Sequence, residues 1–329
     1  MTNQMPTRKL RDLEVSAIGL GCMSFGRAMG DCSEAESHAT LDAVWDAGIN
    51  FLDVANVYGP HISEDVMGTW LASRRHQPVI ATKAGIQRDP NRPVNNDPAY
   101  LEAELDGSLK RLGADCVDLF YIHRHEQAVP IEDVAGFMAG LISKGKIKGW
   151  GMSEVSPTTL RRAHTVTPVS AVQNEYSLWS RQPELGLIQD CAKLGVTFVA
   201  FSPLARGVFG RTIIDPNSIE FGPFRAEMPR FHAGNWEHNV KIANRFHALA
   251  QDHGFTAPAL ALAWTMAQGD HIVPIPGTRS IDHLNDWIKA DEITISRDLA
   301  AEIDAVLPIG WAWGDRYSEA QSSTAERYC

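Results

Sequence analysis

Short apolar runs alternate with amphipathic stretches along almost the whole chain. Eight of these runs have the composition of buried β-strands, and they cover residues 17–23, 50–56, 79–85, 117–123, 147–153, 171–176, 196–203 and 271–277. The stretches between them have helical patterns. One begins with Ser33 and Glu36 in the spacing of a capping box and ends at Gly48. Strands that alternate with helices in this way predict parallel β-α-β units.

Eight near-continuous apolar strands favour a closed (β/α)8 TIM barrel of the α/β class. A doubly wound sheet is the alternative, but it usually has a G-x-G-x-x-G turn after its first strand, and residues 19–26 (GLGCMSFG) lack that spacing. Residues 8–16 predict an N-terminal hairpin that closes the bottom of the barrel. Residues 204–235 predict a long loop after the seventh strand, and residues 308–329 predict a C-terminal tail over the mouth. We expect residues 1–329 to form a single domain.

Composition narrows the class of partner. The chain has 329 residues, 44% of them hydrophobic and 21% charged, with a net charge of −10. The acidic balance argues against binding to a nucleic-acid backbone. The N-terminal segment lacks the apolar core of a secretory signal, and no apolar run approaches the ~20 residues that span a bilayer. Five cysteines without a C-x-x-C pair favour reduced thiols. We therefore expect a cytoplasmic protein whose partner is a small molecule, with no nucleic acid and no membrane.

Polar residues stand at the carboxyl ends of the predicted strands, where barrels of this kind gather their active sites. They are Asp53, Lys83, His123, Ser153, Gln173 and Ser202. A buried carboxylate without a partner is costly, and an ion pair between Asp53 and Lys83 removes that cost. A nearby ammonium lowers the pKa of a phenol, so Asp53 and Lys83 can tune Tyr58 as a general acid. His123 would donate a hydrogen bond to a substrate oxygen.

These side chains suit the reduction of a carbonyl by hydride from an external donor, with Tyr58 supplying the proton. The alternative is that these polar side chains only satisfy one another's hydrogen bonds in the mouth of the barrel and have a structural role. A metal site is not expected, because His123 and His125 are joined by no set of Cys, Asp or Glu ligands.

Several motifs add a family resemblance to this interpretation. They are GLGCMSFG, LDVANVYG with Glu64 after it, IATKAG, DLFYIHR, KGKIKGWGMSE, VQNEYSLW, FSPLARGVFG and VPIPGTR. Together they resemble the aldo-keto reductase superfamily, in particular its bacterial-type NADP-dependent members, over nearly the full chain. The resemblance places the catalytic residues of the family on Asp53, Tyr58, Lys83 and His123. It also implies a nicotinamide cofactor that lies extended across the mouth without a Rossmann fold.

The resemblance further implies a set of cofactor contacts. The positions are Gly21, Met23, Asp53, Ser153, Glu154, Gln173, Phe201, Ser202, Leu204, Arg206, Gly207, Gly277, Thr278, Arg279, His283 and Asp286. Ser153 and Gln173 would hold the carboxamide of the nicotinamide, with Glu154 where many members have Asn. Phe201 would stack on the nicotinamide ring, and residues 202–207 would bind the diphosphate.

Arg279 bears on the choice between NADPH and NADH. Its guanidinium and the neighbouring Thr278 hydroxyl suit a 2′-phosphate, so we expect NADPH, with NADH less favoured. The alternative is that Arg279 stacks on adenine. His283 and Asp286 would lie at the same adenosine end, in positions where relatives often have a second basic residue and a Glu.

Aromatic residues predict a mouth suited to a bulky or ring-bearing carbonyl compound. Phe25 and Trp311 are the expected substrate contacts, with Arg124 or His125 near the polar groups of the substrate. Trp313 and Tyr317 also belong to the tail. The alternative for both tryptophans is that they only pack the tail on the barrel.

Two other functions remain open. One is an aldolase-type barrel in which Lys83 forms a Schiff base with the substrate. The other is a regulatory subunit that binds the cofactor as a sensor without major turnover.

Overall fold

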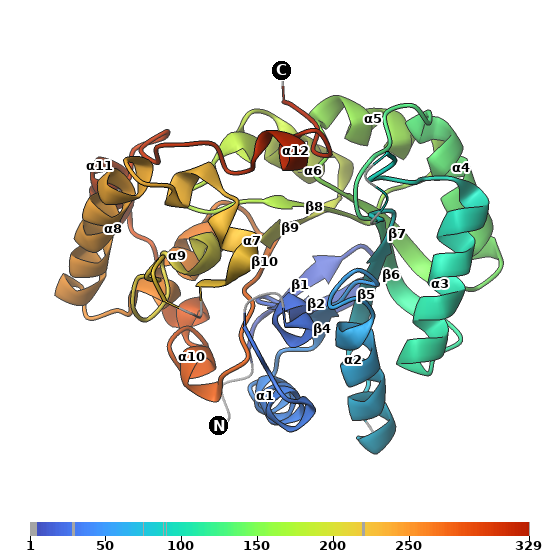
Figure 1. The fold of residues 1–329 in the computed structure, drawn as a ribbon, viewed down its shortest axis with the longest axis horizontal. Helices are drawn as coiled ribbons and strands as arrows, with labels where there is room; N and C mark the ends of the chain where they lie inside the picture. The colour runs from blue at the N-terminus through green and yellow to red at the C-terminus, as the bar shows by residue number, and fades with distance from the viewer. Residues whose placement is uncertain are drawn as a thin grey trace.

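The computed structural model describes residues 5–27, 30–74, 76–87, 89, 91–218 and 221–328, and its central feature is a sheet of eight parallel strands (Figure 1). The strands are β3 (Leu20–Gly21), β4 (Phe51–Asp53), β5 (Val79–Ala84), β6 (Val117–Ile122), β7 (Ile147–Ser153), β8 (Ala171–Glu175), β9 (Thr197–Phe201) and β10 (Ile272–Ile275). Each strand pairs with the next one along the chain. A parallel bridge between Gly21 and Gly277 then joins the first strand to the last. The predicted (β/α)8 barrel is confirmed, and the doubly wound alternative is wrong.

Helices surround the strands and cover their outer faces (Figure 1). The α-helices of the described residues, including α7 and α12 of the segments over the mouth, are α1 (Glu34–Asp46), α2 (Ile62–Ser73), α3 (Pro98–Leu112), α4 (Ile131–Ser143), α5 (Pro157–Val166), α6 (Leu187–Leu194), α7 (Gly222–Ala226), α8 (Asn235–Asp252), α9 (Ala257–Ala267), α10 (Ile281–Asn285), α11 (Arg297–Val306) and α12 (Glu319–Ser322). The capping box of Ser33 and Glu36 begins α1 as predicted. None of the helices in the described residues has the length and apolar character needed to cross a membrane.

The predicted hairpin closes the amino-terminal end of the barrel. Strands β1 (Thr7–Leu10) and β2 (Leu13–Ser16) pair antiparallel. Leu10 and Val15 are buried with Phe51, Leu119 and Val273, side chains of three different barrel strands. Because this end is filled with apolar side chains, the polar residues of the barrel interior can gather only at the opposite, carboxyl end.

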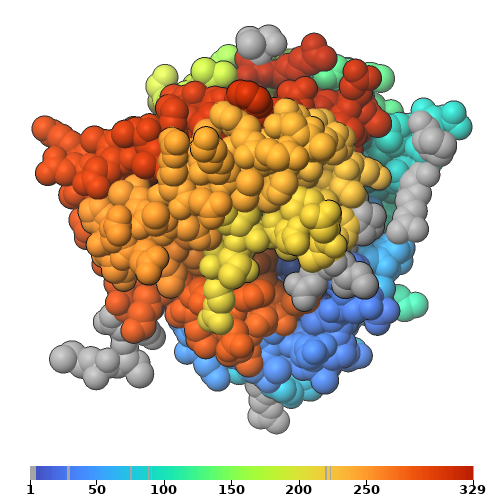
Figure 2. Space-filling model, turned by 60° about the vertical axis from the view of Figure 1, so that its left-hand side comes forward, coloured from blue at the N-terminus to red at the C-terminus, as the bar shows by residue number. Residues whose placement is uncertain are grey.

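Two long segments lie over that carboxyl end. The loop after β9 contains a short 3₁₀ turn (Ala205–Gly207) and α7, and Figure 2 shows it in yellow on the surface, between orange and blue parts of the chain. The ion pair between Arg211 and Asp286, 2.7 Å apart, ties this loop to the end of α10. The C-terminal tail is tied down by the Glu326 carboxylate, which accepts a hydrogen bond of 2.8 Å from the N–H of Ser156 at the start of α5. Both segments were expected from the sequence.

Gly68 sets how closely α2 and α3 approach each other. A Cβ atom at Gly68 would lie 1.9 Å from the backbone carbonyl oxygen of Arg111. The close approach also brings the buried Glu64 carboxylate within 2.7 Å of Arg111 Nε.

Gly68→Ala should therefore destabilise the protein by about 1–3 kcal/mol, since the backbone of one helix must move away from the other. Gly140→Ala is the matched control, because Gly140 is an exposed residue of α4 with nothing within 4 Å of an added Cβ. Alanine there should leave stability unchanged or raise it by up to ~1 kcal/mol. Denaturant unfolding of both variants measures the difference, and a Gly68→Ala variant as stable as Gly140→Ala would contradict this account of the packing.

Candidate active site

A buried ion pair between Asp53 and Lys83 lies at the centre of the barrel mouth. Asp53 ends β4 and Lys83 lies in β5, and their side chains are 2% and 0% exposed. Lys83 Nζ donates to an Asp53 oxygen, to Val54 O at 2.9 Å and to Tyr58 Oη at 3.3 Å. The second Asp53 oxygen accepts a bond of 2.8 Å from Gln173 Nε2. Each charge is therefore compensated, as a buried pair requires.

The electrostatics keep Lys83 charged and Tyr58 protonated. Burial lowers the pKa of Lys83, but the neighbouring Asp53 and Tyr58 raise it by more, so the ammonium persists. Burial raises the pKa of Tyr58, and this effect outweighs the lowering by Lys83. We expected the ammonium to lower the phenol pKa. It acts in that direction, but the net shift is upward because the hydroxyl is out of water.

His123 follows β6 and faces Tyr58. The two rings meet edge to face with centroids 5.8 Å apart. Burial lowers the pKa of His123 well below its ordinary value, and the charges of Arg124 and Lys83 add to this effect. The imidazole is therefore neutral near pH 7. Its Nδ1 atom is buried and has no hydrogen-bond partner among the described residues.

Asp53, Tyr58 and His123 line a cavity of about 1200 Å³ that extends from them to α10. Its wall contains most of the predicted cofactor and substrate positions: Gly21, Met23, Asp53, Tyr58, His123, Arg124, Ser153, Gln173, Phe201, Ser202, Leu204, Arg206, Gly207, Gly277, Thr278, Arg279, His283 and Asp286. Lys83 is not part of the wall, but it bonds to two residues that are, Asp53 and Tyr58. Because the volume exceeds the usual ~300–1,000 Å³ of a small-molecule site, there is room for a cofactor together with a substrate.

The turn after β9 has an unusual backbone. Ser202, Ala205 and Arg206 are in the left-handed region, with φ of 52°, 51° and 57°, and Gly207 has φ of 104°. Left-handed residues in such a turn direct peptide N–H groups to one side and form a concave nest for an anion. This is the turn on which we expect the diphosphate of a cofactor.

Besides Lys83, three predicted site residues lie outside the cavity wall. Phe25 is 1% exposed and packs in the core between helices and strands. Trp311 is also buried, and its Nε1 donates to Leu178 O at 2.7 Å. The prediction that Phe25 and Trp311 line the mouth is wrong for this structure, and Trp311 packs the tail on the barrel as the alternative proposed. Tyr317, four residues past Trp313 in the same tail, is the tail aromatic that reaches the cavity wall.

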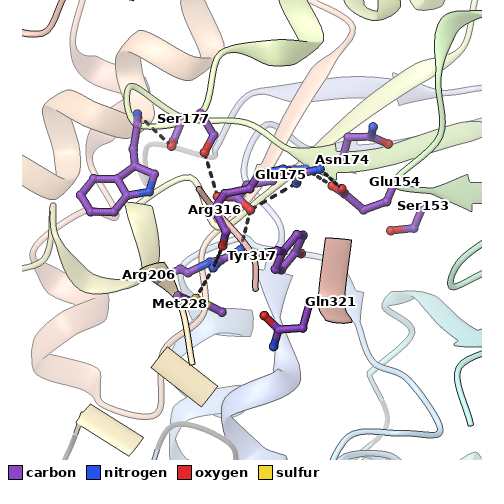
Figure 3. Close-up of polar contacts among 12 residues, drawn as sticks. Ser153, Glu154, Asn174, Glu175, Ser177, Arg206, Met228, Arg316, Tyr317 and Gln321 are labelled. Carbon is purple, nitrogen blue, oxygen red and sulfur yellow. Dashed lines mark hydrogen bonds and ion pairs between the residues drawn. The ribbon is translucent and has the colours of Figure 1, made fainter. Parts of the chain in front are cut away.

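The third is Glu154, whose side chain turns away from the predicted nicotinamide site. It pairs with Arg316 of the tail, and its other oxygen accepts a bond of 2.9 Å from the Glu175 N–H (Figure 3). Glu175 in turn binds Arg206 at 2.6 Å and Arg316 at 3.4 Å. We call these four residues the tail cluster. Both Glu154 oxygens are therefore engaged within the protein, and Glu154 is not among the residues of the cavity wall, which speaks against the expected contact with the carboxamide.

The tail cluster also changes the role of Arg206. Its guanidinium lines the cavity but is paired with Glu175 and donates to Arg316 O at 2.7 Å. Burial would raise the pKa of Glu175, but Arg206, Arg316 and Arg230 lower it below its ordinary value, so the carboxylate stays charged. A diphosphate bound near Arg206 would therefore share the Arg206 guanidinium with the Glu175 carboxylate.

The adenosine end is formed by the start of α10 and by α1. Thr278 Oγ1 accepts a bond of 3.1 Å from the Ser280 N–H. The Arg279 guanidinium packs against Gly30, where a Cβ atom would lie 2.9 Å from Nη2. Asp286, expected near adenine, has its carboxylate bound by Arg211 of the long loop. Arg211 was not predicted, because its partner lies 75 residues away.

Lys83→Met tests whether the central pair is as buried as described. The variant leaves the Asp53 carboxylate uncompensated, so the free energy of unfolding should fall by about 3–5 kcal/mol. The double variant Asp53→Asn/Lys83→Met removes the buried charge and should recover part of that loss. Guanidinium chloride unfolding at pH 7.5 compares the two. Equal stabilities of the single and double variants would show that the charge of Asp53 is not the cause.

Comparisons with known proteins agree with this fold. A model of the aldo/keto reductase family matches residues 17–308. A Schizosaccharomyces pombe protein named aldo-keto reductase yakc [NADP(+)] is 37% identical over 327 residues, or 97% of this chain and 96% of that protein. The structure of a glycerol dehydrogenase from Gluconobacter oxydans superposes with a TM-score of 0.82 at 25% identity, covering 92% of this chain and 94% of that one. The holo form of an aldo-keto reductase from Bacillus halodurans gives a TM-score of 0.76 at 24% identity over 97% and 100% of the two chains. The chain belongs to the aldo/keto reductase family.

Proposed function

We propose that this protein reduces an aldehyde or ketone to an alcohol with NADPH, and that Tyr58 is the general acid. The observation that carries the proposal is the position of the Tyr58 hydroxyl, which lies 3.3 Å from the Lys83 ammonium and beside a neutral His123 in the wall of a large cavity. Family membership supports the reaction class, and the name of the S. pombe relative includes NADP(+).

The residues present fit a nicotinamide dinucleotide. The cavity reaches from Tyr58 at one end to Arg279 at the other, and the nest of residues 202–207 lies in its wall. Phe201 offers a ring beside the barrel axis for stacking. Ser153 and Gln173 are in place to hold a carboxamide, although Gln173 here donates to Asp53. Glu154 takes no part in this set.

When bound, NADPH would supply the hydride that goes to the carbonyl carbon of the substrate. Tyr58 gives its proton to the carbonyl oxygen as the new C–H bond forms, so the alcohol leaves complete. The raised pKa of Tyr58 keeps this proton in place at neutral pH, and the Lys83 ammonium stabilises the phenolate that remains. The neutral His123 donates a hydrogen bond to the same oxygen as charge develops there.

The geometry weakens the aldolase alternative. A Schiff base needs a neutral, accessible amine, whereas Lys83 is fully buried and its pKa is raised by Asp53 and Tyr58. The sensor alternative keeps the same cofactor site, and measured turnover on simple aldehydes separates it from an enzyme.

Cys22, Cys32, Cys116 and Cys191 are free thiols in the described part of the chain, which supports the proposed cytoplasmic location.

Tyr58→Phe should reduce aldehyde turnover by about 10²–10⁴-fold, because it removes the proton donor. NADPH affinity, measured by fluorescence quenching, should change little, because the hydroxyl is directed at the substrate. Tyr100→Phe is the matched control, since it deletes the same atom from a helix outside the cavity wall. Turnover by Tyr58→Phe within threefold of the wild type would rule out this assignment.

Arg279→Ala should weaken NADPH binding and leave NADH nearly unaffected, if the guanidinium binds the 2′-phosphate. A hydrogen bond to a charged group contributes about 1.5–3 kcal/mol, so a loss of roughly ten- to hundredfold is expected for NADPH. Arg297→Ala removes the same charge from an exposed site outside the cavity and serves as control. Both cofactors are titrated into all three proteins. Equal losses for NADPH and NADH would mean that Arg279 stacks on adenine instead.

A further inference from the structure

Arg124 is a buried cation in the wall of the reaction end of the cavity. It directly follows His123 and is 9% exposed. Its Nη1 donates to His123 O at 2.6 Å and to Ser153 Oγ at 3.3 Å, and its Nη2 donates to Tyr317 Oη at 3.4 Å. All three acceptors are neutral. The Nε atom is buried and has no hydrogen-bond partner among the residues that the structure describes.

The charge of Arg124 also lacks a carboxylate partner within that part of the chain. Three buried carboxylates at the mouth are already used, because Asp53 pairs with Lys83 and both Glu154 and Glu175 belong to the tail cluster. A buried charge without a counter-ion is costly and is uncommon unless a ligand supplies the counter-ion.

Other arginines of this chain show what the unpaired edge of Arg124 can bind. The Nε and Nη2 atoms of Arg92 donate hydrogen bonds of 2.8 and 2.9 Å to the two carboxylate oxygens of Glu126. Arg162 holds Glu132 at 2.7 Å through each of the same two atoms. In Arg124 this edge holds only the long Tyr317 contact. The edge is therefore suited to a carboxylate, which binds a guanidinium through two parallel hydrogen bonds.

The position of Arg124 ties it to the reaction centre. It follows His123, whose ring meets that of Tyr58 with centroids 5.8 Å apart, and all three residues line the same cavity. Its charge also acts to lower the pKa of Tyr58 and of His123. A group that binds the edge formed by Nε and Nη2 would replace the Tyr317 hydroxyl, because that hydroxyl is the present acceptor of Nη2. The tail cluster, through Arg316, holds the neighbouring Tyr317 at that point (Figure 3).

We propose that Arg124 binds a carboxylate of the substrate, so that the substrate is an aldehyde or ketone with a carboxylate near its carbonyl group. The proposal rests on the proposed function, since it assumes that a carbonyl is reduced at Tyr58. It makes Arg124 a specificity-determining residue of that reaction.

The test compares kcat/KM for two matched pairs of substrates: succinic semialdehyde with its methyl ester, and pyruvate with methyl pyruvate. The wild type should prefer the acid in at least one pair. Arg124→Met should lose about ten- to hundredfold more on that acid than on its ester, because only the acid gives up a charge-assisted hydrogen bond. Arg124→Lys keeps a charge without the fork and should retain part of the preference. Tyr317→Phe removes only the competing hydroxyl and should retain it fully.

Three results would overturn the proposal. They are a wild type that prefers the ester in both pairs, an equal loss on acid and ester in Arg124→Met, and a loss of NADPH affinity that matches the loss on the acid. Loss of the acid preference in Tyr317→Phe would equally count against it, since that would trace the effect to docking of the tail.

Binding of succinate, followed by calorimetry, separates this proposal from the proposed function. Succinate affinity that falls tenfold or more in Arg124→Met supports the anion site even in a protein that turns over none of the four substrates, and in that case the proposed function fails. A wild type that reduces the esters but binds no succinate and ignores the acids would leave the proposed function standing and reject the carboxylate site.

Discussion

The structure of the mouth depends on one buried ion pair, between Asp53 and Lys83. The two residues come from adjacent parallel strands, so the pair exists only when β4 and β5 are correctly registered. Asp53 then fixes Gln173 of β8 from across the barrel, and Lys83 reaches Tyr58 in the loop after β4. Removing either charge would leave the other uncompensated in the interior, so the position of Tyr58 and the fold of the barrel depend on the same interaction.

A second set of charges, the tail cluster, determines what else faces the cavity. It joins the ends of β7 and β8 to the loop after β9 and to the C-terminal tail. Because Arg316 is held there, the next residue, Tyr317, is placed against Arg124. The tail is therefore part of the cavity wall, and the proposed binding of substrate at Arg124 would be coupled to its docking.

The sequence predicted what depends on local pattern and on strand ends. The eight strands, the hairpin and the capping box of α1 follow from residue spacing, and Asp53, Lys83 and His123 were found because barrel strands bring their carboxyl ends together. Glu154 was misjudged because its partner, Arg316, is 162 residues away and leaves no local signal. Trp311 and Tyr317 are both aromatic tail residues, and only the path of the tail decides that Trp311 packs inside while Tyr317 faces the cavity.

The distribution of paired cations bears on the proposed carboxylate site at Arg124. Several cations in or behind the cavity wall already have carboxylate partners: Lys83 has Asp53, Arg206 has Glu175, and Arg211 has Asp286. An incoming anion must compete with those carboxylates, and near Arg206 it meets the negative charge of Glu175 as well. At Arg124 it competes only with neutral oxygens, which bind a guanidinium less strongly than a carboxylate does. Internal pairing thus makes Lys83, Arg206 and Arg211 poorer sites for a substrate carboxylate than Arg124, which is the basis of the carboxylate site proposed beside Tyr58.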